Sequence, residues 1–244
     1  MRIVVLLFSL LLSALAPVAG RAEQPRSESP PETVVLLHGL ARSGRSMHLL
    51  GSRLSDAGYV VHNVRYPSTE LSPDGLDAHL HKQLVACCKK TRRLHFVTHS
   101  LGGILIRAYL AAHETRNLGR VVMLAPPNHG SEAVDLLGGS ALFRWALGPT
   151  ATQLGTDAQS LPNRLPPPDF EVGIIAGTRS INPLGSMVVP GESDGTVSVQ
   201  SAKLEGMSDF IMVPETHTFI MRSESVAAQT LEFLRSGRFK RSNP

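Results

Sequence analysis

The sequence predicts an α/β fold in which helices flank a mostly parallel central sheet. Short runs rich in Val, Ile, Leu and Phe alternate with longer segments of helical period, as in consecutive βαβ units. The first strand run is apolar throughout, as in strands covered on both faces. A chain of 244 residues with 42% hydrophobic and 18% charged residues is long enough, and apolar enough, for one globular domain.

The first 22 residues have the pattern of a secretory signal peptide. Arg2 precedes an apolar run from Ile3 to Leu15, and small residues follow. The run is shorter than the roughly 20 residues of a membrane-spanning helix. Cleavage after Gly20 and cleavage after Ala22 both fit, and an uncleaved anchor is the alternative. We therefore expect a protein exported to the periplasm or the extracellular space.

A polar, proline-bearing segment at 23–32 is expected to be a flexible lead-in. The apolar run at 33–39 predicts the first strand, which ends at a glycine. Helical spacing at 46–58 predicts a helix with Ser46 as its cap and a glycine as its stop. A second strand is expected at 59–67, where a proline ends it.

The middle of the chain continues the alternation. A helix is predicted at 72–90 from the spacing of its leucines, followed by a strand at 94–99. A helix at 101–114 and a strand at 120–127 complete the next unit. The alternation then stops between residues 131 and 168, and we interpret this segment as a lid or cap insertion.

The last predicted elements are a strand at 170–178, a strand at 209–214 and a helix at 223–237 that Ser223 caps. Between the last two strands lies "GESDGTVSVQSA", in the loop after the fifth strand. No internal repeat and no second domain are expected.

Cys87 and Cys88 are the two cysteines of the chain and are adjacent. Neighbours inside a helix do not easily reach disulfide geometry. Cys87 continues the helical spacing of Leu76, Leu80 and Leu84, which predicts a small core residue. We expect no disulfide, so the fold depends on its core.

The formal net charge of +4 and the pI of about 9.4 do not indicate nucleic-acid binding. Lys and Arg are scattered, and aromatic residues make up 5% of the chain, without a basic aromatic stripe. The basic run at 89–93 lies at a predicted helix end, where it complements the helix dipole. Loss of Arg2 and Arg21 with the signal peptide would lower the net charge by two, to +2.

Three reactive residues follow three predicted strands. Ser100 ends the strand at 94–99, Asp194 follows the strand at 170–178, and His217 follows the last strand. The carboxyl ends of parallel strands share one edge of a sheet, where ligands bind. A hydroxyl becomes a nucleophile when an imidazole takes its proton and a carboxylate fixes the imidazole tautomer. The order Ser, Asp, His therefore predicts a catalytic triad.

The segment "LLHGL" ends the first strand in a loop near Ser100. We expect the backbone N–H groups of Leu40 and Leu101 to form an oxyanion hole, the latter helped by the helix dipole. Gly102 and Gly103 would let the following helix pack closely against the strands. A role of Ser100 as a plain helix cap would not require the other elements.

Together "THSLGG", "LLHGL", "SDGTVSVQSA" and "THTFIM" resemble the α/β-hydrolase superfamily. "PPNHGS" and "DGTV" are similar to small secreted bacterial lipases and esterases. The resemblance implies acyl-enzyme chemistry on esters without a cofactor. We expect the α/β-hydrolase domain over 33–237 and a basic tail at 238–244. Thr98 departs from the G-x-S-x-G elbow pattern, in which glycine occupies this position.

The other candidates receive structural interpretations. His99 is expected to point away from Ser100 along the strand, and His38 to support the oxyanion loop. His129 is expected to pack in its loop, with a place in the pocket lining as the alternative. Glu192 and Asp209 are the rivals of the triad aspartate. Asn128 stands where some relatives keep their acid, but an amide cannot stabilise an imidazolium as a carboxylate does.

The insertion carries a candidate acyl pocket or lid, for which the core of a small helical cap is the alternative interpretation. Its residues are Leu142, Phe143, Trp145 and Leu147.

The predicted function is a secreted serine carboxylic-ester hydrolase acting on small-molecule or lipid esters, with transient contact to a lipid interface. An acyltransferase with the same triad and a non-catalytic binding protein are the alternatives. No metal ligand spacing is present. Oligomeric state stays open.

Overall fold

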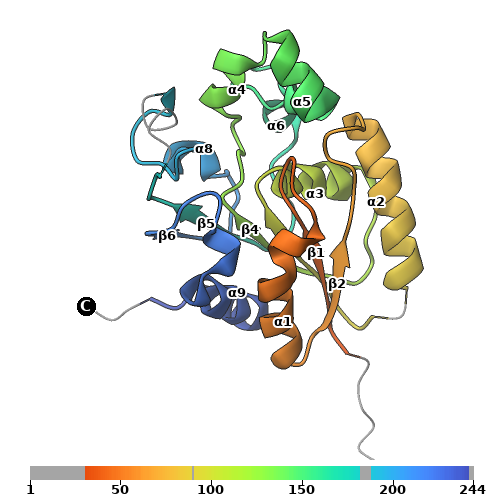
Figure 1. Cartoon of the computed structure of the whole chain (residues 1–244). Coiled ribbons are helices and arrows are strands. Elements are labelled where there is room, and N and C mark those ends of the chain that lie inside the picture. Colours follow the sequence, from red (N-terminus) through yellow and green to blue (C-terminus); the bar gives the residue numbers. More distant parts are fainter. Residues whose placement is uncertain (1–30, 90, 182–187, 242–244) are drawn as a thin grey trace, which may run out of the picture.

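The structure, a computed structural model, describes residues 31–89, 91–181 and 188–241. These residues form a six-stranded sheet in the order β2-β1-β3-β4-β5-β6, and every neighbouring pair of strands is parallel (Figure 1). The predicted α/β architecture is confirmed. The strands are β1 (Thr33–Leu37), β2 (Val60–Val64), β3 (Leu94–His99), β4 (Leu118–Leu124), β5 (Val172–Gly177) and β6 (Asp209–Val213).

The central strands are apolar throughout because both faces of the sheet are covered. Along β1, Val34 and Leu36 face one core, whereas Val35 and Leu37 face the other, and all four are fully buried. Helices α2 (Pro73–Cys87) and α3 (Leu101–Ala112) supply the core that includes Val35. Helices α1 (His48–Asp56) and α9 (Glu224–Ser236) supply the core that includes Val34 (Figure 1).

The helix ends correct one expected cap and agree with two other signals. Ser46 is not the cap of α1, because it lies inside the short 3-10 helix η1 (Gly44–Met47) that precedes it. Gly58 follows α1 with φ of +96°, a conformation that glycine adopts without strain. The hydroxyl of Ser223 accepts a hydrogen bond from Val226 N–H at 3.5 Å and so caps α9.

Short helices lie within the segment between β4 and β5. They are α4 (Glu132–Leu137), α5 (Ala141–Ala151) and α6 (Leu161–Arg164), and they lie above the sheet in Figure 1. Between β5 and β6 lies α8 (Val199–Ala202), and η2 (Ile220–Arg222) precedes α9.

The topology fixes where a ligand would bind. Strand β1 pairs with β2 on one side and with β3 on the other. The chain therefore leaves β1 toward one sheet edge and returns to β3 on the opposite side. In doubly wound sheets such a switch point opens a crevice at the carboxyl ends of the two strands. Residues 39–42 and Ser100 follow these two strand ends.

The ends of the chain bear on three expectations. The predicted signal peptide and most of the lead-in lie outside the described residues; of the lead-in, Glu32 pairs with Arg92 at 2.6 Å. None of the described helices is long and apolar enough to cross a bilayer. Part of the expected basic tail is packed, since Phe239 is 4% exposed and its ring centroid lies 4.9 Å from that of Phe233.

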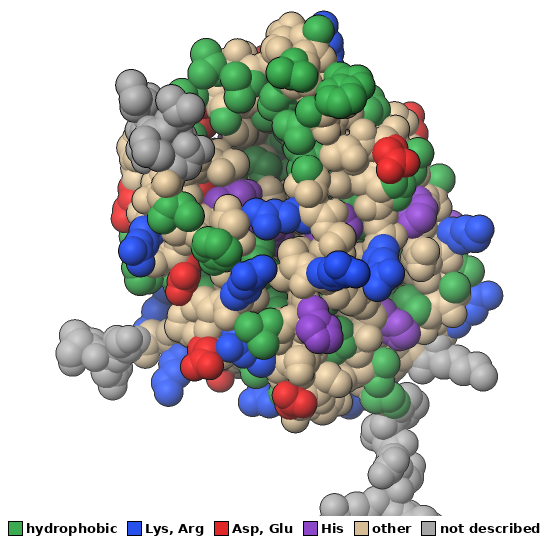
Figure 2. Space-filling view, in the orientation of Figure 1, with side chains coloured by type: hydrophobic (Ala, Val, Ile, Leu, Met, Phe, Trp, Pro, Cys, Tyr) green, Lys and Arg blue, Asp and Glu red, His purple; other side chains and the backbone are tan. Residues whose placement is uncertain are grey.

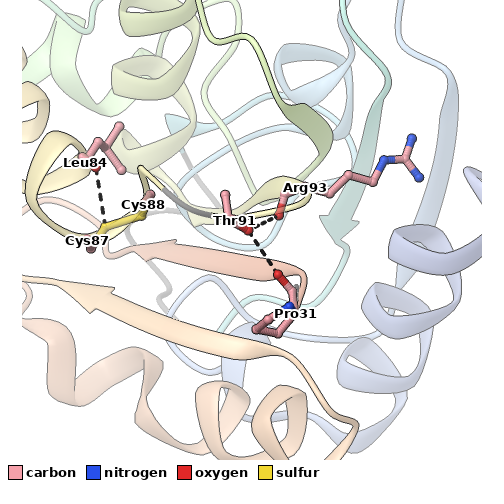
Figure 3. Close-up of a disulfide and its surroundings, with 6 residues drawn as sticks. All are labelled: Pro31, Leu84, Cys87, Cys88, Thr91 and Arg93. Carbon is pink, nitrogen blue, oxygen red and sulfur yellow. Dashed lines mark hydrogen bonds between the residues drawn. A yellow bond between two sulfur atoms is a disulfide. The ribbon is translucent and has the colours of Figure 1, made fainter. Parts of the chain in front are cut away.

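The expectation of unpaired cysteines is wrong, because Cys87 and Cys88 form a disulfide (Figure 3). Helix α2 ends at Cys87, and Cys88 has φ of −121° and ψ of 13°, outside the helical region. The pair is therefore not held at helical dihedral angles on both sides. Cys88 is the buried member and Cys87 is half-buried.

Candidate active site

Ser100 occupies a strained turn between β3 and α3. Its φ of +53° and ψ of −122° lie in a region that residues with a side chain rarely adopt. The Ser100 N–H donates to the Leu124 carbonyl at 2.9 Å, which ties the turn to β4. The Ser100 hydroxyl makes no capping hydrogen bond with α3. The residue therefore does not serve as a helix cap, and its Oγ is free to face another group.

Glycines allow α3 to start against the sheet. A Cβ on Gly102 would lie 2.7 Å from the carbonyl oxygen of Leu37, a backbone atom that cannot move aside. Thr98, which replaces the usual elbow glycine, is fully buried. Its hydroxyl would lie 3.5 Å from a Cβ on Gly103, an ordinary contact distance. Thr98 therefore does not require a glycine at position 103.

His217 contacts both other members of the predicted triad. Its Nε2 lies 3.0 Å from Ser100 Oγ, and its Nδ1 lies 2.7 Å from Asp194 Oδ2. With Nδ1–H donating to the carboxylate, Nε2 is left to accept the serine proton. Loops after β3, β5 and β6 thus bring together Ser100, Asp194 and His217, in the arrangement that the sequence predicts.

The carboxylate of Asp194 is buried and fixed. The residue is 3% exposed, and its Oδ1 accepts hydrogen bonds from the N–H groups of Thr196 at 3.0 Å and Val197 at 2.8 Å. Gly195 has φ of +89°, which permits this turn. The Asp194 carbonyl also accepts the N–H of His217 at 3.2 Å. Both carboxylate oxygens of Asp194 are therefore held by hydrogen bonds before the imidazole of His217 is charged.

His99 packs against His217, a contact that the sequence did not indicate. Its Nε2–H donates to the His217 carbonyl at 2.9 Å, and the two ring centroids are 4.9 Å apart. Burial holds the pKa of His99 well below its usual value, and the adjacent His217 lowers it further. Among the described residues, no partner reaches its Nδ1. His99 is therefore a neutral support for His217.

The loop after β1 presents the first expected oxyanion donor. Leu40 lines the cavity that contains Ser100, and its N–H bonds to no acceptor in the described part of the chain. Ala41, with φ of +52°, donates its N–H to Ser68 Oγ at 3.0 Å, which fixes the turn. The second expected donor, Leu101 N–H, lies in the first turn of α3, where no intrahelical carbonyl is in reach.

A cavity of about 250 Å³ opens onto Ser100 and His217. Figure 2 shows a hollow below the hydrophobic side chains at the top of the molecule. Of the expected acyl pocket or lid, Leu147 lines the cavity; Phe143 is half-buried away from it, and Leu142 and Trp145 are 70% and 83% exposed.

Most of the apolar wall of this cavity was not indicated by the sequence. Besides Leu147, the wall is formed by Pro127, Val134, Leu154 and Val197. These residues come from four separate segments, and no short sequence pattern joins them.

The other two candidates for the carboxylate beside His217 form no hydrogen bond with that residue. Asp209 pairs with Arg241 and accepts the N–H of Phe239 at 2.7 Å, so it fixes the end of the chain. Glu192 is exposed. The imidazole of His217 bonds to neither of them.

Two further histidines have structural partners. His38 stacks on Tyr66 with ring centroids 4.0 Å apart, and its Nδ1–H donates to Gly39 O at 2.9 Å. Burial lowers the pKa of His38 and raises that of Tyr66. His129 lies 3.3 Å from Asn163 Oδ1 and does not line the cavity.

Asn128 is bound to a buried arginine that sequence analysis did not single out. Arg107 is 4% exposed and donates to the carbonyl and the side-chain oxygen of Asn128, both at 3.2 Å. A third bond of 3.4 Å reaches Leu165 O, at the end of the segment that carries α4 to α6. Burial lowers the pKa of Arg107 to about 10. Arg107 thus ties this segment to α3.

One group among the described residues has metal-binding side chains in close proximity, although the sequence showed no ligand spacing. The ligand atoms of His62, Cys87 and Cys88 lie within 4.8 Å of one another. Both sulfurs are joined in the disulfide, so neither is a thiolate ligand. Cys88 lines a separate cavity with Leu94, the first residue of β3, at the opposite edge of the sheet from Ser100.

Comparison with known proteins supports the fold. A model described as "Alpha/beta hydrolase family" matches residues 34–202. No match to a curated protein sequence was found.

Solved structures with this architecture include enzymes of ester chemistry. The mature lipase BlEst2 of Bacillus licheniformis has a TM-score of 0.67 at 23% identity, covering 88% of this chain and 94% of that one. The phospholipase PlaB of Legionella pneumophila has a TM-score of 0.62 at 18% identity, covering 86% and 60%. The metagenomic carboxyl esterase MGS0156 has a TM-score of 0.59 at 18% identity, covering 85% and 71%. At these identities the likeness shows the fold alone.

Proposed function

This chain belongs to the alpha/beta hydrolase family, and on that premise we propose that it is an exported serine hydrolase that cleaves carboxylic esters through an acyl-enzyme on Ser100. One observation carries the proposal. His217 lies between the Ser100 hydroxyl at 3.0 Å and the buried Asp194 carboxylate at 2.7 Å. This is the geometry that activates a serine for acyl transfer.

The proposed acylation step begins with an attack by Ser100. Ser100 Oγ attacks the ester carbonyl carbon while His217 Nε2 takes its proton, and the carbonyl electron pair moves to oxygen. The N–H groups of Leu40 and Leu101 donate to that oxyanion, where one such donor is worth about 2.7–4 kcal/mol. His217 then gives the proton to the departing alcohol, and the acyl group stays on Ser100.

Deacylation repeats these roles with water as the nucleophile. His217 takes a proton from water, the hydroxide oxygen bonds to the acyl carbon, and Ser100 Oγ leaves with the proton. Asp194 stays ionised throughout and stabilises the imidazolium. No cofactor takes part in these steps.

The substrate class follows from the cavity. Its volume of about 250 Å³ and its apolar wall suit a modest acyl group. BlEst2, PlaB and MGS0156 are named as a lipase, a phospholipase and a carboxyl esterase. We assign Leu147 to the acyl wall. The exposed Leu142 and Trp145 are assigned to transient contact with a lipid interface, as parts of a lid formed by 131–168.

The test is hydrolysis of chromogenic esters from short to long acyl chains by the mature protein. Ser100→Ala and His217→Ala should each abolish turnover while the fold persists. Asp194→Asn should lower kcat by up to about 10⁴-fold. Rising activity with chain length would indicate a lipase, and activity on short chains alone an esterase. A folded protein inactive on every ester would contradict hydrolysis and favour an acyltransferase or a binding protein.

A fluorophosphonate probe tests the nucleophile directly. It should label Ser100, as peptide mapping by mass spectrometry would show. Ser131→Ala is the matched control, because Ser131 lines the same cavity but donates its hydroxyl to Thr196 O at 3.1 Å. This variant should still be labelled, whereas Ser100→Ala should not.

Export is tested by N-terminal sequencing of the secreted protein, with cleavage expected after Gly20 or Ala22.

A further inference from the structure

The turn after β1 places an arginine at the mouth of the candidate active site. The N–H of Arg42 donates to Gly39 O at 3.2 Å, which closes a tight turn over residues 39–42. The bond from Ala41 N–H to the buried Ser68 holds this turn, and the positive φ of Ala41 sets the direction in which the next residue leaves it. The same turn carries Leu40. Arg42 is thus positioned by the loop that presents the expected oxyanion donor.

Arg42 is a charged side chain in a cavity that is otherwise neutral or apolar. Apart from the two histidines, none of the other described residues that line the cavity is ionisable. Val134, Leu147 and Leu154 supply an apolar part from the segment between β4 and β5. The positive charge of Arg42 is also among the influences that keep the pKa of the buried His99 low.

The guanidinium of Arg42 has no anionic partner among the described residues. Other arginines of this chain pair with carboxylates, as Arg53 does with Glu224 at 3.3 Å and Arg120 with Glu171 at 2.9 Å. Arg42 is half-buried, yet no ion pair or side-chain hydrogen bond within the described residues satisfies it. A partly desolvated guanidinium with free donors binds carboxylate or phosphate oxygens well, because its planar fork matches two oxygens.

We propose that Arg42 binds an anionic group on the alcohol portion of the ester, so that the enzyme prefers esters whose leaving group carries a carboxylate or phosphate oxygen. This inference rests on the proposed ester hydrolysis at Ser100. The apolar part of the cavity takes the acyl chain, and the anion therefore belongs to the alcohol. Figure 2 shows Lys and Arg side chains gathered below the hollow, a distribution that favours approach of anions.

The first experiment compares two soluble esters of equal size. One is the butyrate ester of 3-hydroxybenzoate, and the other is the butyrate ester of its neutral primary amide. In the wild type, kcat/KM should favour the anionic ester. Arg42→Met should lower the ratio of anionic to neutral kcat/KM by roughly 10-fold, mainly through KM, and Arg42→Lys should restore part of it. Salt should weaken the wild-type preference.

Arg45→Met is the matched control. Arg45 lies in η1, three residues along the chain, is exposed and does not line the cavity. Arg45→Met removes the same charge from the same region. An unchanged ratio of anionic to neutral kcat/KM in Arg45→Met, together with a reduced ratio in Arg42→Met, would show that Arg42 acts by contact with the substrate. Equal ratios in wild type and Arg42→Met, for soluble and lipid substrates alike, would overturn the proposal.

A second pair of substrates distinguishes a lipid headgroup from a small soluble anion. Mixed micelles carry phosphatidylglycerol or the neutral diacylglycerol with the same acyl chains. Sensitivity to Arg42→Met confined to phosphatidylglycerol would identify a phospholipid headgroup, and sensitivity confined to the soluble pair a small anionic ester. A wild type inactive on every ester would refute ester hydrolysis itself. Activity with no preference for anions would refute the role of Arg42 alone.

Discussion

The imidazole of His99 donates a hydrogen bond of 2.9 Å from Nε2–H to the backbone carbonyl of His217. The N–H of His217 donates in turn to the Asp194 carbonyl at 3.2 Å. The peptide groups on both sides of the His217 side chain are therefore held. A neutral, fully buried residue of β3 and the loop after β5 together set the position of the imidazole that faces Ser100.

His99 should act as a positioning residue for His217. We expect His99→Phe to lower kcat by about 3- to 10-fold with little change in KM, because a neutral hydrogen bond is worth about 0.5–1.5 kcal/mol. His99→Gln keeps a donor near the position of Nε2 and should retain more activity. An unchanged kcat in a folded His99→Phe would show that this hydrogen bond does not position His217.

Stability should fall in mild acid. Burial lowers the pKa of His38, His95 and His99, so the folded state binds fewer protons than the unfolded state below the unfolded pKa of about 6.5. The contribution of these residues is complete above that pH and is lost as pH falls toward their folded values. As pH falls through this range, each of these histidines lowers the free energy of unfolding by up to about 1.4 kcal/mol per pH unit. Thermal melts from pH 7.5 to 5 should show a falling Tm.

The slope of Tm against pH shows whether the buried histidines cause the decline. His99→Gln removes one buried titrating group and should flatten the dependence of Tm on pH. His48→Gln is the matched control, because His48 is exposed on α1 and its replacement should leave the slope unchanged. A Tm that rises or stays level between pH 7.5 and 5 would contradict the assignment.

Much of the sheet and the arrangement around Ser100 could be predicted from local signals. Continuous apolar runs predict buried parallel strands, and Ser100 directly follows one of them. Because carboxyl ends of parallel strands share an edge, the placement of Ser100, Asp194 and His217 follows from the order of strands in the sequence. Their contacts agree with the prediction, whereas their catalytic roles stay proposals.

The remaining features depend on tertiary contacts that no local pattern encodes. The spacing of Leu142 and Trp145 does not tell which side of α5 faces the cavity, and the structure leaves both exposed. Phe239 lies in a basic segment, yet it joins the core because it reaches Phe233 on the preceding helix. Cys87 and Cys88 could bond because α2 ends between them, and helix ends are the least certain part of a sequence-based prediction.

The disulfide should contribute little to stability. It joins adjacent residues, so it closes the shortest loop and removes little entropy from the unfolded chain. We expect reduction by a dithiol to lower the free energy of unfolding by about 1 kcal/mol and Tm by about 2–4 °C. Cys87→Ser should behave similarly. Both cysteines should be alkylated under denaturing conditions only after reduction. Alkylation without reductant would show that the disulfide is absent.

Gly102→Ala should impair both catalysis and stability. The added Cβ would lie 2.7 Å from Leu37 O and 3.0 Å from His38 O, so the first turn of α3 must move away from the loop after β1. That movement displaces Leu101 N–H relative to Leu40 N–H. Loss of one oxyanion donor costs about 10²- to 10³-fold, so we expect kcat to fall by about 100-fold. Overpacking should lower the free energy of unfolding by about 1–3 kcal/mol.

Substitutions of two other glycines serve as controls for Gly102→Ala. At Gly103 the nearest atom to an added Cβ is the side-chain Cβ of Pro126 at 3.0 Å, and at Gly139 no atom lies within 4 Å. Gly103→Ala should therefore be milder than Gly102→Ala in kcat, and Gly139→Ala should match the wild type. Steady-state kinetics and thermal melts of the three variants separate the two effects. Equal kcat in wild type and a folded Gly102→Ala would mean that the spacing between the two N–H groups does not limit catalysis.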